Sequence, residues 1–298
     1  MHHHPDAGTT CRILLAAVAV GLAAAAALAG CGSDADEPVV TRPAAVTLTD
    51  ADPASGVYLV QGARSVASGA VRISVRNDGA KERGAQLIGV QGRHGVAEAF
   101  TALNKVREGA AMPTWLRWAG GIGVVRPGSS AAFTVDLRPG SYYVVDRSFE
   151  GNAADLAALE QSARLEVRHA DDGAALATPQ AAITATEYAF ETRGLSASDE
   201  EVLLDNRGAE PHDFVLSPIV EGRTLEDVKA FATGEDESGP PPVDFANEVI
   251  SGVLDGGSKQ TMRLGLTAGR YALICFASDR RGGPPHVAKG MVTEVTIR

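Results

Sequence analysis

Most of the chain after residue 50 consists of short segments in which apolar and polar residues alternate. These segments are rich in Val, Ile, Leu, Thr and Tyr, and β-branched and aromatic residues favour strands. Asn-x-Gly, Pro-Gly and Gly-Gly turns separate them, as expected between neighbouring strands. Many short strands at regular intervals predict an all-β fold of the sandwich type.

Two of these segments occur twice in the chain. Residues 71–80 resemble residues 202–209, and residues 133–142 resemble residues 262–271. The same offset in residue number relates the last residue of each segment to the last residue of its match. Two independent matches at one offset indicate a duplicated structural unit.

Helical patterns are sparse. Thr224 and Asp227 have the spacing of a capping box ahead of an apolar segment, which predicts that a helix begins there. Residues 96–103 of the first copy loosely match this helical segment of the second copy. Residues 233–243 are rich in acidic residues and proline, and we expect them to form a loop.

Residues 1–31 have the anatomy of a secretory signal peptide. Arg12 precedes an apolar run that continues to Ala29. Residues 28–31 resemble the lipobox of bacterial lipoproteins, which implies lipid attachment at Cys31, and residues 32–50 are expected to form a flexible tether. A single transmembrane anchor is the alternative, although small alanines dominate where a stable span favours Leu and Ile. Both interpretations place the rest of the chain outside the cytoplasm at the cell membrane.

Length, charge and cysteine content narrow the classes of function. A chain of 298 residues favours two domains, which we expect at residues 51–172 and 180–298. The net charge of -10 and the lack of a basic cluster argue against nucleic-acid binding. Cys275 is the one cysteine after residue 31, which excludes a disulfide framework. We expect this thiol to be buried or to bind a metal.

Four residues of the second copy have the identity and order of a metal ligand set. His212 follows a strand, Cys275 ends a late strand, and His286 and Met291 begin the last one. This pattern resembles the cupredoxin family, in which one histidine comes from an early strand and the other ligands come from the loop joining the last two strands. The resemblance implies a type 1 blue copper site formed by His212, Cys275, His286 and Met291. It also implies two tandem cupredoxin-like Greek-key β-sandwiches with short helical insertions.

The chemistry of these side chains agrees with copper. Two imidazoles, one thiolate and a weak thioether serve both oxidation states of copper in a near-trigonal site. Zinc also accepts Cys and His, but Met is a poor zinc ligand. Each residue alone has an ordinary interpretation as a core or loop residue. After residue 31, however, the chain has four histidines and one cysteine, and three of these five fall on ligand positions.

Two features depart from the family pattern. The loop between Cys275 and His286 has ten residues, which is long for the family, and Asp213 stands where an asparagine often follows the early histidine. These departures bear on the reduction potential and the rigidity of the site. The resemblance further implies that His286 has an edge at the surface, inside an apolar patch with Val287, where a redox partner would dock transiently.

The first copy lacks the ligand set. The offset between the copies places Arg83 at the position of His212 and Asp146 at the position of Cys275. No thiolate is available there, and residues 147–155 contain neither His nor Met. The first copy is therefore expected to keep the fold without a metal and to have a structural or partner-binding role.

The leading hypothesis is a membrane-tethered one-electron carrier with an unidentified redox partner protein. Two-domain cupredoxins also include nitrite reductases and laccases, which need further copper held by additional histidines. Here Ile274 precedes Cys275, and His94 and His169 are the spare histidines after residue 31, so we do not expect an enzyme. Two hypotheses compete with electron transfer, namely a copper-holding or delivery lipoprotein and a metal-free interaction module.

Overall fold

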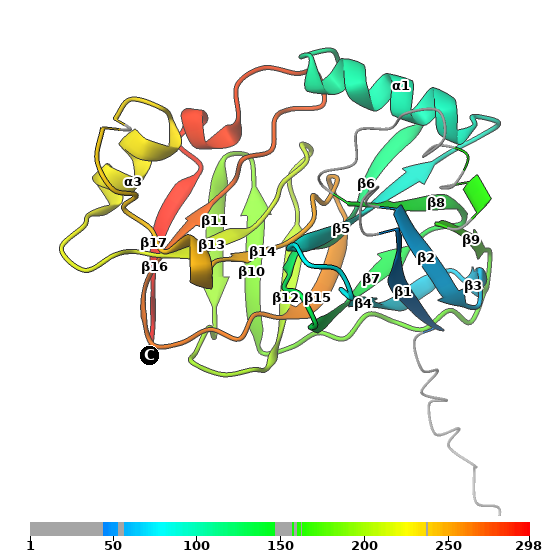
Figure 1. Cartoon of the computed structure of the whole chain (residues 1–298), viewed down its shortest axis with the longest axis horizontal. Coiled ribbons are helices and arrows are strands. Elements are labelled where there is room, and N and C mark those ends of the chain that lie inside the picture. Colours follow the sequence, from blue (N-terminus) through cyan, green and yellow to red (C-terminus); the bar gives the residue numbers. More distant parts are fainter. Residues whose placement is uncertain (1–43, 53–56, 147–156, 158–159, 162, 237) are drawn as a thin grey trace, which may run out of the picture. The chain divides into compact units, whose positions relative to one another are not determined.

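The alternating segments fold as strands wherever the structure describes them (Figure 1). The computed structural model describes residues 44–298 apart from 53–56, 147–156, 158–159, 162 and 237. The all-β prediction is confirmed. The first copy contains the strands β1 (Ala44–Asp52), β2 (Val57–Gly62), β3 (Ser65–Ala67), β4 (Gly69–Arg76), β5 (Arg83–Val90), β6 (Leu116–Val125), β7 (Ser130–Leu137), β8 (Gly140–Val145) and β9 (Arg164–Arg168). The second copy contains β10 (Ala181–Thr186), β11 (Ala189–Arg193), β12 (Glu201–Asn206), β13 (Val215–Pro218), β14 (Val249–Ile250), β15 (Lys259–Arg263), β16 (Gly269–Ile274) and β17 (Val292–Ile297).

The second copy is a sandwich of two sheets. One has the order β14-β13-β16-β17, and the other has the order β11-β10-β12-β15. Successive side chains of a strand point to opposite faces, so Leu216 and Leu273 lie in the core between the sheets. Val215 and Ala272 lie in a second cluster on the other face, together with Val228 of α3 (Leu225–Ala232). Both faces of the sheet that carries β13 and β16 are therefore covered.

The first copy repeats the same local structures. β1 and β4 run parallel, as β10 and β12 do. The side-chain amide of Asn77 donates to the carbonyls of Lys81 and Val125, at 2.7 Å each. The side-chain amide of Asn206 donates at 2.8 Å to the two carbonyls at the equivalent positions of the second copy. The offset found in the sequence therefore holds for hydrogen bonds as well as for residue types.

The two copies share one sheet through β7 and β15, which pair antiparallel. Phe133 pairs with Met262, its own equivalent in the repeat, as in a contact between two copies related by a two-fold axis. Gly121 and Gly252 meet at a second contact, where the Gly252 amide donates to the Gly121 carbonyl at 2.8 Å. The described residues from 44 to 298 accordingly belong to one compact unit, and the domain limits 51–172 and 180–298 stay a prediction.

The helical segments follow the expected pattern. The backbone amide of Asp227 donates to the Thr224 hydroxyl at 3.2 Å, and the Thr224 amide donates to Asp227 at 2.7 Å. This capping box opens α3 as predicted. In the first copy α1 (Val96–Arg107) extends the helix expected at residues 96–103. Among residues 233–243, those described contain no helix or strand.

The predicted signal peptide, the lipobox with Cys31 and residues 32–43 of the tether lie outside the described residues. β1 begins at Ala44, so the last part of the segment predicted as tether, 32–50, belongs to a strand. The alternating sequence of this part explains why it pairs with β2 and β4. In the part of the chain that the structure describes, no helix is long and apolar enough to cross a membrane.

Candidate metal centre

Three potential metal-binding side chains of the second copy lie next to one another. His212 precedes β13 and forms an isolated bridge with Leu254, while Cys275 directly follows β16. Because β13 and β16 pair, these two residues are neighbours. His286 begins the short 3-10 helix η2 (His286–Lys289). All three side chains are fully buried.

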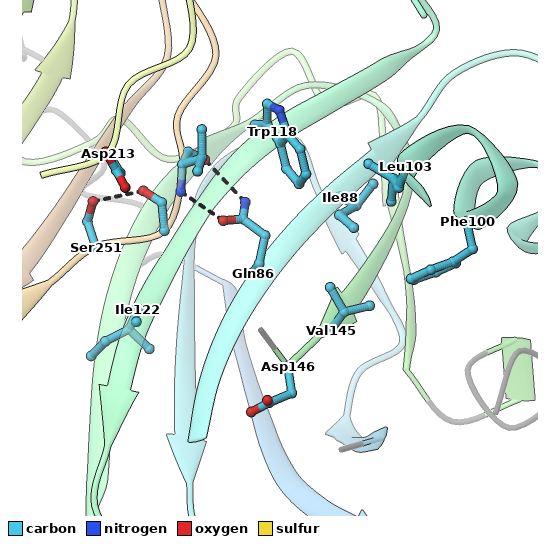
Figure 2. Close-up of a pocket in the computed structure, with 13 residues that line it drawn as sticks. Gln86, Ile88, Phe100, Leu103, Trp118, Ile122, Val145, Asp146, Asp213 and Ser251 are labelled. Carbon is cyan, nitrogen blue, oxygen red and sulfur yellow. Dashed lines mark hydrogen bonds between the residues drawn. The ribbon is translucent and has the colours of Figure 1, made fainter. Parts of the chain in front are cut away.

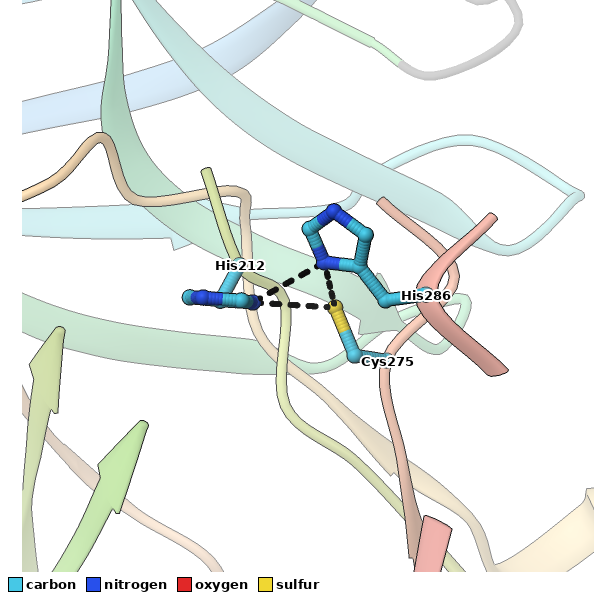
Figure 3. A group of neighbouring side chains, drawn as sticks. All are labelled: His212, Cys275 and His286. Carbon is cyan, nitrogen blue, oxygen red and sulfur yellow. Dashed lines mark hydrogen bonds between the residues drawn. The ribbon is translucent and has the colours of Figure 1, made fainter. Parts of the chain in front are cut away.

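The donor atoms of these residues form a small triangle (Figure 3). Cys275 Sγ lies 3.5 Å from His212 Nδ1 and 3.4 Å from His286 Nδ1. The two Nδ1 atoms are 3.0 Å apart. Within the described residues, this is the one group of three or more His, Cys, Asp or Glu side chains that could hold a metal ion.

The triangle has the dimensions of a metal coordination site. A point equidistant from the three atoms lies about 1.9 Å from each, close to the metal–nitrogen bond length of about 2.0 Å. His212 Nε2 is buried and has no hydrogen-bond partner among the described groups, so its ring makes its polar contacts through Nδ1. Two imidazole nitrogens and one thiolate in a trigonal arrangement are the strong ligands of blue copper. The cluster fits a type 1 copper site.

Comparisons with known proteins give a distant likeness of fold. No family model matches the chain, and no curated protein matches its sequence. Reduced auracyanin from Roseiflexus castenholzii is 21% identical, over 39% of this chain and 94% of that chain, with a TM-score of 0.27. A copper nitrite reductase from Nitrosomonas europaea is 14% identical, over 86% of this chain and 94% of that chain, with a TM-score of 0.22. These scores are low, so the assignment of copper rests on the donor atoms.

Met291, the fourth predicted ligand, lies close to Cys275 and His286 in the structure. It is fully buried in the same core cluster as Cys275. Its carbonyl accepts a hydrogen bond from the Cys275 amide at 3.2 Å, and its own amide donates to the His286 carbonyl at 2.9 Å. The backbone therefore connects Met291 to two of the three clustered ligands, and its role as the axial ligand stays a prediction.

Asp213 supports the loop that follows Cys275. One of its carboxylate oxygens accepts hydrogen bonds from the amides of Phe276 at 2.7 Å and Ala277 at 3.2 Å. The Ala277 carbonyl in turn accepts from the His286 amide at 2.8 Å. The aspartate thus ties the three ligand-bearing segments together, as an amide oxygen at this position could also do, and it adds a negative charge near the thiol.

Burial sets the protonation states of the donors. Burial, and after it the neighbouring His286, lowers the pKa of His212 from 6.5 to about 4. Burial also lowers the pKa of His286, although the hydrogen bond that its ring donates to Asp279 acts in the opposite direction. Burial, followed by the charge of Asp213, raises the pKa of the Cys275 thiol. The imidazoles are therefore neutral near pH 7, and the thiol requires a bound cation to lose its proton.

The expectation of an exposed ligand edge at His286 is wrong. His286 is fully buried, and Val287 is buried in the cluster that also contains Val228. Asp279 covers the ring, with its Oδ1 at 2.9 Å from His286 Nε2, and Lys289 forms an ion pair with the same carboxylate. The neighbouring apolar residues in the sequence suggested a patch, but the long loop places Asp279 over the ring, where it pairs with Lys289 of η2.

The first copy has an ion pair where the second has the copper site. Arg83 and Asp146 occupy the positions predicted to match His212 and Cys275, and both are buried. Their closest charged atoms are 4.0 Å apart. The Asp146 carboxylate also accepts a hydrogen bond from the Gly84 amide at 2.9 Å. The first copy thus has two opposite charges at the positions of two metal ligands, and opposite charges offset part of the cost of burying each other.

A pocket of about 190 Å³ lies between the copies (Figure 2). Apolar side chains such as Ile88, Leu103 and Trp118 form much of its wall. Gln86 joins the copies at this wall, since its side chain donates to the Val253 carbonyl at 3.2 Å and accepts from the Val253 amide at 2.8 Å. None of the four predicted copper ligands lines this pocket.

Proposed function

We propose that the protein is a one-electron carrier that uses a mononuclear type 1 copper. The observation that carries this proposal is the triangle of His212 Nδ1, Cys275 Sγ and His286 Nδ1, which is buried and held by backbone hydrogen bonds. Copper, when bound there, supplies a metal that accepts and releases one electron.

The chain's own residues keep the site the same in both oxidation states. The amide of Val287 donates to the Cys275 carbonyl at 2.8 Å, and the amide of His212 donates to the Leu254 carbonyl at 2.9 Å. These bonds fix Cys275 and His212 through their backbones. A preorganised site needs little movement when its charge changes, which favours rapid electron transfer.

Copper delivery is the second candidate function. Burial argues against it, because all three donors are fully buried and release of the ion would require the loop of residues 276–285 to open. A carrier keeps its metal through many cycles, whereas a delivery protein must pass it on. The donor arrangement therefore favours electron transfer over delivery.

A redox titration of the copper-loaded full chain tests the proposal. We expect one copper per chain, reversible one-electron reduction, and retention of the metal in the presence of a copper-free acceptor protein. Rapid loss of copper to the acceptor would favour delivery. More than one copper per chain, together with turnover of nitrite or of dioxygen, would favour an enzyme.

We further propose that the carrier is anchored outside the cytoplasm by lipid at Cys31. The support is the apolar run that ends in Leu-Ala-Gly-Cys at residues 28–31. Cys31→Ala is expected to abolish labelling by a radioactive fatty acid and to release or misprocess the protein, whereas Cys11→Ala is expected to leave labelling intact. Soluble protein that begins at another residue in wild-type cells would contradict this proposal.

A further inference from the structure

His286 has a polar contact on the side of its ring that faces away from the other donors. Its Nδ1 faces Cys275 and His212, while its Nε2 lies 2.9 Å from Asp279 Oδ1. A ring that binds a metal through Nδ1 keeps its proton on Nε2, so Nε2–H donates to this carboxylate. Carboxylates placed in this way orient the ligand ring of a metal site and raise its basicity.

Two further side chains hold Asp279 in place. The Tyr188 hydroxyl donates to Asp279 Oδ1 at 3.0 Å, and Lys289 forms an ion pair with Oδ2. Lys289 Nζ also donates to the Tyr188 hydroxyl at 3.0 Å and lies 4.4 Å from the centre of its ring. Asp279, Lys289 and Tyr188 therefore form a closed set of contacts over His286.

The backbone conformation of Tyr188 is further evidence that the contacts over His286 are specifically arranged. Tyr188 lies in the turn between β10 and β11 and has a φ of 59°. Among the described residues it is the one non-glycine residue with positive φ. Side chains are disfavoured in this left-handed conformation, and such strain persists where surrounding contacts determine it. Here the conformation brings the ring of Tyr188 edge-on to His286, with the ring centres 5.1 Å apart.

We propose that Asp279 is a positioning residue that orients His286 and lowers the reduction potential of copper bound at this site. This inference rests on the proposed electron-transfer function. A carboxylate bonded to the ligand ring makes the ring a stronger donor, which favours Cu(II) over the less charged Cu(I). Lys289 opposes this effect because its positive charge partly neutralises the carboxylate of Asp279. The two residues therefore shift the potential in opposite directions.

The test is the reduction potential of copper-loaded variants of the full chain. Asp279→Asn keeps the shape of the side chain and removes its charge. We expect it to favour reduction about tenfold, a rise of about 59 mV for one electron, with copper content and the visible band retained. Lys289→Met is expected to lower the potential. A site that was merely loosened would not respond in opposite directions to the two substitutions.

Glu187→Gln is the matched control. The charge of Glu187 acts on the ligand His212. Its carboxylate accepts a hydrogen bond from the Ala209 amide. The substitution Glu187→Gln removes one negative charge near the site, so we expect a smaller rise in the reduction potential than with Asp279→Asn. An unchanged or lower potential in Asp279→Asn, or a rise no larger than that of Glu187→Gln, would overturn the proposal. If Asp279→Asn does not fold, an unchanged or raised potential in Lys289→Met overturns it. Failure of the wild-type protein to take up copper would instead refute the proposed function.

Discussion

His212 and His286 are two imidazoles buried beside a thiol, which is a costly arrangement for a protein core. Burial is compatible with folding because the rings stay neutral, as the lowered pKa of each histidine indicates. The sequence predicted this group because histidine and cysteine are rare in the chain and fall at spaced ligand positions. It could not predict Asp279, because the contact with His286 depends on how a ten-residue loop folds back on itself.

The lowered pKa of His212 predicts how the copper-free protein responds to acid. The folded state binds a proton at His212 only near pH 4, whereas the unfolded chain binds it near pH 6.5. Between these values the unfolded state binds more protons, so the free energy of unfolding decreases as the pH falls. We expect the urea midpoint of copper-free protein to drop between pH 7 and pH 5.

The control for this prediction is His212→Gln, which lacks the titrating ring. Its midpoint is expected to drop less over the same pH range, even if the variant is less stable at pH 7. Equal drops in both proteins would show that His212 does not set the acid sensitivity.

At the scale of elements, the alternating pattern and the constant offset between the copies predicted strands, turns and helix starts well, because each depends on local sequence. Asn77 and Asn206 illustrate this, since both close equivalent turns. The loop of residues 276–285 was harder to interpret. Its Arg280 guanidinium binds Asp255 at 2.7 Å and the carbonyls of Pro113 and Leu116 at 2.9 Å, and no local pattern specifies partners so far away in the sequence.

Arg280 is therefore expected to hold the ligand loop against the first copy. Arg280→Ala would leave Asp255 buried without its cation, a loss of about 3 kcal/mol, measured as the free energy of unfolding of copper-free protein. Arg280→Lys keeps the charge but cannot reproduce the forked hydrogen bonds, so an intermediate loss is expected. Wild-type stability in Arg280→Ala would show that the contacts of Arg280 do not stabilise the loop.

At the scale of the whole molecule, the two copies pack through equivalent positions of their repeat. The duplication could be predicted from the sequence, but the pairing of β7 with β15 could not, because periodicity gives no information on which strand edges meet. The close approach of Gly121 and Gly252 is a second contact between the copies that periodicity could not predict. A Cβ atom on Gly252 would lie 2.5 Å from the Gly121 nitrogen, which a real side chain cannot occupy without a shift of the backbone.

Gly252→Ala is accordingly expected to destabilise the protein by about 2 kcal/mol through overpacking. Gly239→Ala is a suitable comparison, since a Cβ there meets one flexible arginine atom at 3.8 Å. Chemical unfolding of both variants measures the difference. Equal stability of the two variants would mean that the junction between the copies can relax at little cost.

Copper titration of the full chain, followed by its visible spectrum, is the most direct test of the copper site. We expect one equivalent of Cu(II) to produce an intense absorption band from the Cys275 thiolate. Cys275→Ser is expected to fold and to remain colourless under the same conditions, because a hydroxyl does not replace the thiolate. A wild-type protein that stays colourless and copper-free with excess Cu(II) under oxidising conditions would contradict the assignment of the site.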